Sequence, residues 1–386
     1  MRRLLLSGAT AFSAIIGLVS PGPAEAWERG DVRNFAAIPT FAPSGPGAAC
    51  PNEAKACSSD VEGVTVAPDG TVYSASYGYN RHGALGGYGE FFVFAPDGRL
   101  TKHFPVVGSS PHLIGLEYQQ SSKSVLIADL GKGVVWKVDP ETQTTSLFMQ
   151  APTITKSPGL NALTFDKAGN VYVSDSFQGV IWKTGPNGGP PTMFVDSQTL
   201  SPEAAPGVTL IPPFGANGVE FNNEYTEMYV ANTAYHSIVE VPVTLNHGSV
   251  SVAGKAMVLT TGINAPDGIA VDSHDNLWVD ANQQDEIDVI NPNVVTSQGP
   301  LAKVIAKRGD FQGLSEDATV QGLLFPASPA FSPDGIYIYT SNLALFLPFA
   351  GAPEPAIDSP WTLQVKHYKI AKIRAEIPPL TEQDEK

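Results

Sequence analysis

Residues 267–281 read DGIAVDSHDNLWVDA: an opening residue, a short apolar strand, a His-Asp turn and a second strand rich in Trp and Val. Five other stretches repeat this plan, so that the full set is 62–76, 114–129, 161–175, 217–232, 267–281 and 328–342. Their first residues lie 52, 47, 56, 50 and 61 positions apart. Periods of about 40 to 50 residues with four short strands per unit are typical of β-propeller blades. The sequence therefore predicts an all-β fold, a six-bladed β-propeller with four antiparallel strands per blade around a central channel.

The blade plan predicts which residues share a rim of the ring. The innermost strand begins beside the channel, and the loop between the second and third strands returns to the same face. These loops are expected at 77–90, 129–133, 175–179, 232–236, 282–285 and 342–358. Asp, Asn and Gly are frequent in them, as turn formation requires with or without a ligand.

Closure of the ring requires a partner for the last blade, because an unpaired edge strand is a template for aggregation. Residues 27–60 are expected to form an N-terminal segment in which 28–42, including 32–37, could supply the closing strand. The propeller is expected to span residues 61–375. Its last strands are expected within residues 361–373, where apolar and polar residues alternate. The charged tail, residues 376–386, is expected to be frayed.

Composition excludes several classes of partner. The formal net charge is -15, which repels phosphate backbones and anionic lipid headgroups, so nucleic acid is not an expected partner. Gly 37 and Pro 33 together make 70 of 386 residues, which disfavours long helices, while 42% hydrophobic residues allow a large core.

The N-terminus has the features of a secretory signal peptide. Arg2 and Arg3 precede an apolar stretch, residues 4–20, and Ala24-Glu25-Ala26 supplies a small-x-small cleavage pattern. We expect cleavage after Ala26 and an exported protein, periplasmic or extracellular. A retained anchor is the alternative, and no second run of spanning length follows.

Cys50 and Cys57 are the only cysteines of the chain. In an exported protein, two thiols seven positions apart in a loop-forming stretch are expected to form a local disulfide. Two free thiols in a loop are the alternative.

The opening positions of the repeats differ in chemistry. Four blades present Glu62, Asn161, Asn217 and Asp267, whereas the second and sixth present Ile114 and Ser328. Two carboxylates and two amides without Cys or His make an oxygen cage that suits Ca²⁺ better than zinc or copper. The sequence predicts that these four side chains bind a divalent cation, most simply Ca²⁺, in the central channel.

A structural role for the same residues must be weighed against this. Asn-Gly at 217 and Asp-Gly at 267 are common turn pairs, and Glu62-Gly63 could be a strand entry. The turns that join the first two strands are already supplied about seven residues later, for example by Asp69-Gly70. The opening residues are therefore not needed to make turns.

The order Glu, Asn, Asn, Asp on four blades resembles the gluconolactonase, senescence-marker-protein and paraoxonase-like superfamily of calcium-dependent six-bladed propellers. The strongest local similarities begin at Asn217-GVEF and Asp267-GIAVD, and the resemblance covers about residues 61–373. It implies a catalytic divalent cation at the four positions and hydrolysis of a lactone, aryl ester or organophosphate. It also implies that Asp267 is both a ligand and the general base or nucleophile.

The histidines depart from the family pattern. Paraoxonase-like members have a catalytic histidine at or near the second opening, where this chain has Ile114, with His112 two residues earlier. His112 is a second candidate catalytic residue, although a structural histidine before an apolar strand is the alternative. The phosphatase-like histidine of the sixth blade is replaced by Ser328, so the sequence gives less support to organophosphate hydrolysis. His82 and His236 lie in rim loops, where each is expected to be a solvated surface residue.

Two apolar insertions bear on the substrate. Residues 200–216 and 343–353 are expected to border the metal rim, as a lid over a hydrophobic substrate or as a dimer or membrane contact. We expect a small-molecule lactone or ester substrate. A non-catalytic ligand-binding propeller with a structural calcium is the competing hypothesis, and the sequence does not indicate the oligomeric state.

Overall fold

The computed structural model describes residues 32–53, 55–203, 214–295, 301–350 and 359–375. The expected signal peptide and charged tail lie outside these ranges. The first blade consists of β2 (Val61–Val66), β3 (Val72–Ser76), β6 (Glu90–Phe94) and β7 (Leu100–Pro105). The second consists of β8 (Leu113–Gln119), β9 (Ser124–Asp129), β10 (Val134–Asp139) and β11 (Thr144–Gln150). The third consists of β12 (Leu160–Phe165), β13 (Val171–Asp175), β14 (Val180–Gly185) and β15 (Gly188–Asp196).

The remaining three blades follow the same order. The fourth consists of β16 (Ala216–Phe221), β17 (Glu227–Asn232), β18 (Ser237–Asn246) and β20 (Met257–Thr261), and β19 (Ser249–Val252) extends the far end of β18. The fifth consists of β21 (Pro266–Val271), β22 (Leu277–Ala281), β23 (Glu286–Val295) and β24 (Ala302–Arg308). The sixth consists of β27 (Pro326–Phe331), β28 (Tyr337–Asn342), β29 (Lys369–Arg374) and β1 (Val32–Ala37).

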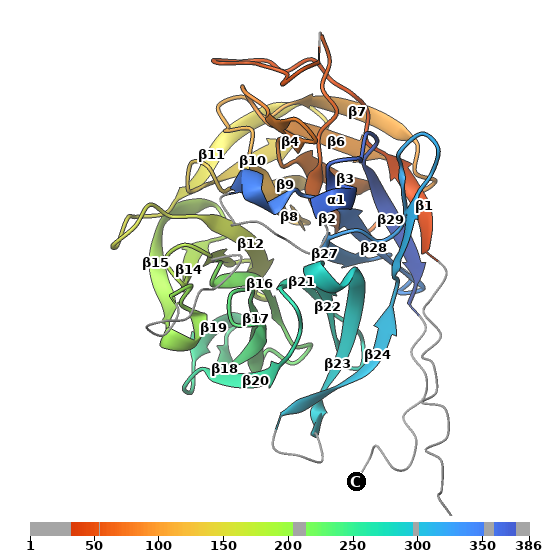
Figure 1. The fold of residues 1–386 in the computed structure, drawn as a ribbon. Helices are drawn as coiled ribbons and strands as arrows, with labels where there is room; N and C mark the ends of the chain where they lie inside the picture. The colour runs from red at the N-terminus through yellow and green to blue at the C-terminus, as the bar shows by residue number, and fades with distance from the viewer. Residues whose placement is uncertain (1–31, 54, 204–213, 296–300, 351–358, 376–386) are drawn as a thin grey trace, which may run out of the picture.

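The six sheets form a closed ring. Each first strand contacts the first strand of the next blade, in the order β2, β8, β12, β16, β21, β27 and back to β2, so these strands surround the axis (Figure 1). The blades pack through their apolar faces: Trp278 of the fifth blade is fully buried, with its ring 5.5 Å from Phe331 of the sixth. The predicted six-bladed β-propeller is confirmed.

The N-terminal strand completes the last blade. β1 runs antiparallel to β29, with Val32 opposite Ile373 and Ala37 opposite Lys369. The buried Lys369 ammonium donates a hydrogen bond to the Asn34 side chain of β1. The sixth blade therefore has a paired outer strand contributed by the other end of the propeller.

Shorter elements lie in the connections. They are β4 (Tyr79–Asn80), β5 (Gly83–Ala84), β25 (Phe311–Leu314), β26 (Val320–Gly322), η1 (Gln198–Leu200), η2 (Asn282–Gln284), η3 (Leu347–Ala350) and α1 (Ser359–Thr362). Residues 361–373, expected to supply the last strands, begin in α1 and contribute the third strand of the sixth blade, β29, from Lys369 onward. No helix in the described ranges is long and apolar enough to cross a membrane.

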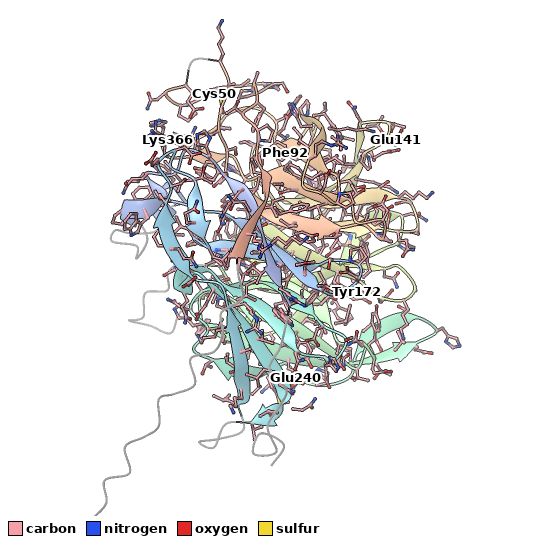
Figure 2. All side chains as sticks on the ribbon, turned by 90° about the vertical axis from the view of Figure 1, so that its right-hand side faces the viewer. Cys50, Phe92, Glu141, Tyr172, Glu240 and Lys366 are labelled. Atoms are coloured by element: carbon pink, nitrogen blue, oxygen red, sulfur yellow. A yellow bond between two sulfur atoms is a disulfide. The ribbon has the colours of Figure 1, made fainter. Side chains whose placement is uncertain are left out.

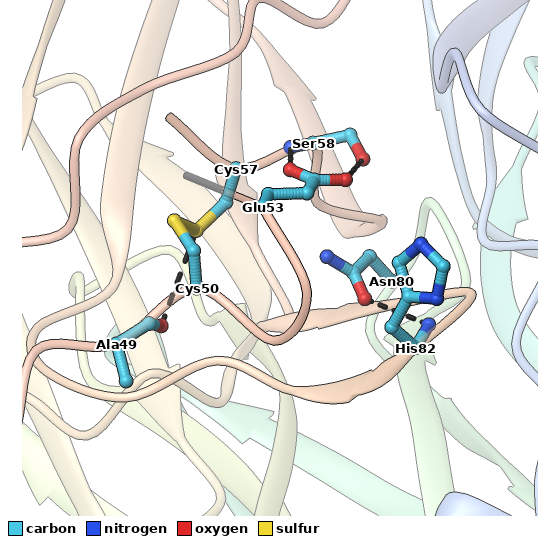
Figure 3. The surroundings of a disulfide bond; sticks show 7 residues. All are labelled: Ala49, Cys50, Glu53, Cys57, Ser58, Asn80 and His82. Carbon is cyan, nitrogen blue, oxygen red and sulfur yellow. Dashed lines mark hydrogen bonds between the residues drawn. A yellow bond between two sulfur atoms is a disulfide. The ribbon is translucent and has the colours of Figure 1, made fainter. Parts of the chain in front are cut away.

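Cys50 and Cys57 form the predicted disulfide. Cys50 lies at one end of the molecule, in the segment between β1 and β2 (Figure 2). Glu53 inside the loop accepts hydrogen bonds from the Ser58 backbone amide at 2.9 Å and its hydroxyl at 3.0 Å (Figure 3). The loop is thus closed by a covalent bond and by a carboxylate.

Candidate functional site

Every innermost strand carries a β-bulge at its opening. In the first blade Val61 pairs with Ser76 and Val64 with Ser74, so three steps on β2 oppose two on β3. The same one-residue shift occurs between the first two strands of all the other blades. A bulge bends the strand and redirects the side chain it carries. The predicted ligands Glu62, Asn161, Asn217 and Asp267 all occupy the first bulge residue of their blades.

The bulge register corrects the alignment of the sixth blade. Pro326 pairs with Asn342 and Pro329 with Thr340, so the first bulge residue is Ala327 rather than Ser328. Ser328 is one position further along the strand, yet it contributes to the site, because it lies near Glu62 and lowers the pKa of that carboxyl. The alignment of the six repeats thus assigned Ser328 to the position that Ala327 occupies, and it did not predict that Ser328 lies near Glu62.

The glycines that follow the opening residues do not make turns. A Cβ on Gly218 would lie 2.2 Å from the carbonyl oxygen of Asp267, and a Cβ on Gly63 would lie 2.5 Å from that of Ile114. Neither distance is possible for a real Cβ atom. Glycine is therefore required because the innermost strands of adjacent blades approach each other closely around the axis.

The four opening side chains are buried and converge. Glu62 is 2% exposed, Asn161 1%, Asn217 3% and Asp267 5%. Asn217 lies close enough to Asp267 to lower the pKa of its carboxyl, and the charges of Glu62 and Asp267 repel each other. Each of the four retains one side-chain oxygen with no hydrogen-bond partner among the described residues: Glu62 Oε2, Asn161 Oδ1, Asn217 Oδ1 and Asp267 Oδ1.

The electrostatics of this cluster oppose its negative charge. Burial, and then repulsion from Asp267, raise the pKa of Glu62 well above its usual range. Burial raises the pKa of Asp267 to about 7, although the hydrogen bond from Asn282 and the nearby Asn217 amide oppose the shift. Asp280, itself buried, adds further repulsion to Glu62. These carboxylates are therefore costly to ionise unless a cation accompanies them.

The donor set fits a hard divalent cation. Four buried oxygens without partners, two of them carboxylate and two amide, provide the neutral and anionic ligands that calcium binds. Among the described residues, no three His, Cys, Asp or Glu side chains gather as a metal cluster of their own. The amide oxygens of Asn161 and Asn217 are thus necessary members of any cation site at this position.

His112 lies directly before β8 and beside Tyr77 and Tyr79, in a defined orientation. Its Nδ1 is 2.8 Å from the backbone carbonyl of Tyr77, which can only accept, so Nδ1 carries the hydrogen and Nε2 is left as an acceptor. Burial lowers the pKa of His112, which favours this neutral form. The ring stacks on Tyr79 with centroids 4.8 Å apart.

The other rim histidines have different surroundings. His236 is not simply solvated, because its Nδ1 accepts a hydrogen bond of 2.9 Å from the Ala265 amide, immediately before β21. It therefore supports the strand that carries Asp267. His82 is half-buried, and its backbone amide bonds Asn80 at 2.9 Å.

The rim around the cluster is aromatic and apolar. Tyr77 is 3% exposed, and its pKa is raised well above the usual value by burial and by nearby acidic groups that include Glu62 and Asp267. Tyr79 stacks on Phe349 of η3 with centroids 6.4 Å apart, and Leu343 and Leu347 pack into the same apolar cluster as Tyr77.

The insertion at residues 200–216 also contributes to the rim. Phe214 stacks on Phe177 of the third blade, with centroids 5.6 Å apart. Residues 204–213 and 351–358 of the two expected lid segments lie outside the described part of the chain. The described ends of both segments thus lie over the rim.

A second layer of polar side chains lines the channel three residues further along the strands. Glu117 accepts a hydrogen bond of 2.9 Å from Thr65, and Glu220 accepts one of 2.7 Å from Thr164. Burial raises the pKa of Glu117 to about 8 and that of Glu220 to about 7. These residues line a cavity of about 390 Å³ at the opposite mouth of the channel, with walls from five of the six innermost strands. The sequence comparison did not single out either glutamate.

Comparisons with known proteins agree with this architecture. The crystal structure of a calcium-binding protein, regucalcin, from Agrobacterium tumefaciens superposes with a TM-score of 0.54 at 17% identity, over 89% of this chain and 99% of that one. A gluconolactonase from Xanthomonas campestris gives 0.54 at 12% identity, over 89% and 98%. A luciferin-regenerating enzyme gives 0.56 at 15% identity, over 84% and 94%. At these identities the likeness establishes the fold.

No curated protein matches the sequence. The family model described as SMP-30/gluconolactonase/LRE-like region matches residues 106–299, which is half of the chain. This segment runs from the end of the first blade into the fifth, and it contains three of the four opening residues with unpaired oxygens. The chain therefore belongs to the SMP-30/gluconolactonase/LRE-like family.

Proposed function

We propose that this protein is an exported, calcium-dependent hydrolase that opens a lactone or cleaves an ester. The observation that carries the proposal is the set of four buried side-chain oxygens, one from each of four blades, that lack a partner within the described protein. Glu62 and Asp267 would balance the charge of the cation, and Asn161 and Asn217 would hold it without adding charge. Calcium accepts six to eight oxygen ligands, which leaves room for substrate and water.

Bound there, the cation would polarise the substrate carbonyl and stabilise negative charge on its oxygen. The chain's own residues supply the proton transfer. Asp267 Oδ2 is held by the Asn282 amide at 2.8 Å, which leaves Oδ1 directed away from this contact and without a protein partner. Asp267 would accept a proton from the attacking water as the new carbon–oxygen bond forms. It would return that proton to the leaving oxygen when the acyl–oxygen bond breaks.

His112 is the second candidate for proton transfer. Its hydrogen bond to the Tyr77 carbonyl leaves Nε2 unprotonated in the neutral ring, which is the form that can accept a proton. The carboxylates and the imidazole are brought to the same rim through Tyr77, whose backbone orients His112 and whose side chain lies in the field of Glu62 and Asp267.

The rim favours a substrate with an apolar or aromatic group. Tyr79 is stacked between His112 and Phe349, and Phe346 packs edge-on against Phe349 at 4.9 Å. Flat apolar groups bind well between such rings. We therefore favour a lactone or ester with a hydrophobic substituent over a free sugar lactone.

The test is an assay of purified protein against aliphatic lactones, phenyl esters and a phosphotriester, with EGTA and after calcium is restored. We expect lactone or ester hydrolysis that EGTA abolishes and calcium restores, with no phosphotriester turnover. Hydrolysis that persists in EGTA would contradict the role of the cation. Calcium binding without turnover of any ester would instead favour a ligand-binding propeller with a structural ion.

A further inference from the structure

The residue that follows the second strand varies with the opening residue of the same blade. In the order of the six blades these residues are Tyr77, Leu130, Ser176, Thr233, Asn282 and Leu343. The four blades with a polar opening residue have a polar residue here. The two blades that open with Ile114 and Ala327 have leucine. Because the residue after the second strand changes together with the opening residue, we expect the two residues of a blade to act together.

In the third and fourth blades this residue holds the amide of the opening asparagine. Asn161 Nδ2 donates to the Ser176 hydroxyl at 3.0 Å, and Asn217 Nδ2 donates to the Thr233 hydroxyl at 2.9 Å. All four residues are at most 3% exposed. Because each amide nitrogen is engaged by a hydroxyl, the amide oxygen is the atom left facing the other opening residues, and both oxygens lack a protein partner.

The same hydroxyls also bond to the next blade. Ser176 donates to the Ala216 carbonyl at 2.7 Å, directly before Asn217, and Thr233 donates to the Pro266 carbonyl at 2.7 Å, directly before Asp267. In the fifth blade Asn282 donates both to Asp267 Oδ2 and to the Pro326 carbonyl of the sixth. A hydroxyl has one hydrogen, so the donation to the carbonyl forces it to accept from the amide.

We infer that Ser176 and Thr233 are positioning residues, which orient the asparagine amides so that oxygen rather than nitrogen faces the proposed cation. Asn282 has the corresponding role for the Asp267 carboxylate. Without the hydroxyl, the amide can rotate by 180° and present two N–H donors to a cation. The inference rests on the proposed cation site and adds the residues that determine its ligand orientation.

Thr233→Val tests this with little change in side-chain shape, and Thr260→Val is a matched control. Thr260 is also a buried threonine of the fourth blade that donates to a carbonyl of the fifth, Ala302, at 2.9 Å, but it holds no opening side chain. Both variants lose one bond between blades. Only Thr233→Val also loses the contact that fixes the Asn217 amide.

The measurement is thermal unfolding of the full-length exported protein as a function of calcium concentration, beginning in EGTA, together with calorimetric calcium binding. We expect both variants to lower Tm in EGTA. Thr233→Val should also weaken calcium binding by about 10-fold or more, the size of effect seen when residues that orient metal ligands are changed. Thr260→Val should keep the wild-type affinity, and Thr233→Ser should restore it.

The outcomes separate this inference from the proposed function. If wild-type protein shows no calcium response, the cation site and this inference both fail. If wild-type protein responds and Thr233→Val binds calcium as tightly, only the positioning role is overturned. An equal loss of affinity in Thr233→Val and Thr260→Val would likewise overturn it, because the effect would then arise from contact between blades alone. If Thr233→Val does not fold, Thr233→Ser against Thr233→Ala decides by the same comparison.

Discussion

Both ends of the central channel contain carboxylates, but these carboxylates differ in burial and in hydrogen bonding. At the far end, Glu117 and Glu220 each accept hydrogen bonds from a threonine of the preceding blade and from a backbone amide. At the other end, Glu62 and Asp267 come from more deeply buried positions of the same set of strands, and each keeps a buried oxygen without a protein partner. A half-buried carboxylate can leave an oxygen open to water, whereas a fully buried carboxylate oxygen without a hydrogen bond is costly. The difference supports the proposal that the cation binds at the end with Glu62 and Asp267.

The largest effect is expected from Asp267→Asn. The substitution keeps a side-chain oxygen at the bulge but removes the charge and the group that accepts the proton. Turnover should fall by a factor on the order of 10² or more and should not recover at saturating calcium. Steady-state kinetics over a calcium titration would show this.

Glu62→Gln and Glu220→Gln are the controls for that experiment. Glu62→Gln should lose calcium affinity and recover most of its activity at high calcium. Glu220→Gln, at the far end, should leave the kinetics unchanged. Full recovery of the Asp267 variant would mean that Asp267 is only a ligand, and His112 would then become the candidate base.

Removal of calcium should have the next largest effect, on stability rather than chemistry. An ion that binds only the folded ring at a concentration 100 times its Kd stabilises it by about 2.7 kcal/mol. Differential scanning calorimetry with EGTA should show a corresponding decrease in Tm. The decrease in Tm should be smaller in Glu62→Gln and unchanged in Glu117→Gln, since Glu117 lies at the far end of the channel and is not one of the proposed ligands. An equal response in both variants would contradict the contrast between the two ends.

Glu117, at the far end of the channel, should contribute to the pH dependence of the free energy of unfolding. The pKa of Glu117 is raised to about 8 in the folded protein, against a usual value of 4.5. Between these values the folded state keeps a proton that the unfolded state releases, so the free energy of unfolding falls as pH rises. The maximal slope for one proton is about 1.4 kcal/mol per pH unit, and partial exposure of Glu117 makes it smaller.

Glu117→Gln should remove this contribution. In EGTA, the variant should gain Tm relative to the wild type at pH 8 and show little gain at pH 5, as measured by thermal melts across that range. A gain that is the same at both pH values would show that the proton on Glu117 is not involved.

The smallest effect is expected at the aromatic rim. Phe349→Ala removes the ring that stacks on Tyr79, and such contacts contribute about 0.5–1.5 kcal/mol. KM for a phenyl ester should therefore rise by about 2- to 10-fold, whereas KM for a small aliphatic lactone should not change. A uniform change for both substrates would argue against a hydrophobic subsite at this place.

The fold was largely predictable from the sequence, because the repeats state the blade plan directly. The bulges were not. A one-residue shift of register leaves no compositional signal, and for that reason Ser328 was assigned to the position that Ala327 occupies. For Gly218 a turn pair and for Gly63 a strand entry were the alternatives from the sequence, whereas both glycines allow contact between strands more than 40 residues apart.

The site was predictable in its opening residues and not in their supports. Glu62, Asn161, Asn217 and Asp267 recur in phase, so their burial and convergence could be expected. In the sequence, Ser176 and Thr233 cannot be distinguished from ordinary turn residues. Only their hydrogen bonds to Asn161 and Asn217 assign them a role. Their one signal is the position they share, directly after the second strand of blades that open with asparagine.

The pairing of β1 with β29 has a mechanical consequence. The strands are antiparallel and Val32 lies opposite Ile373, so both ends of the propeller chain leave the ring at the same place. A force that pulls the two ends apart would act on one hydrogen bond at a time and unzip the strands, rather than load the whole row in shear. The pairing of β1 with β29 would thus separate at low force when the protein is pulled by its termini. Without an applied force, the same six-residue strand holds the ring closed.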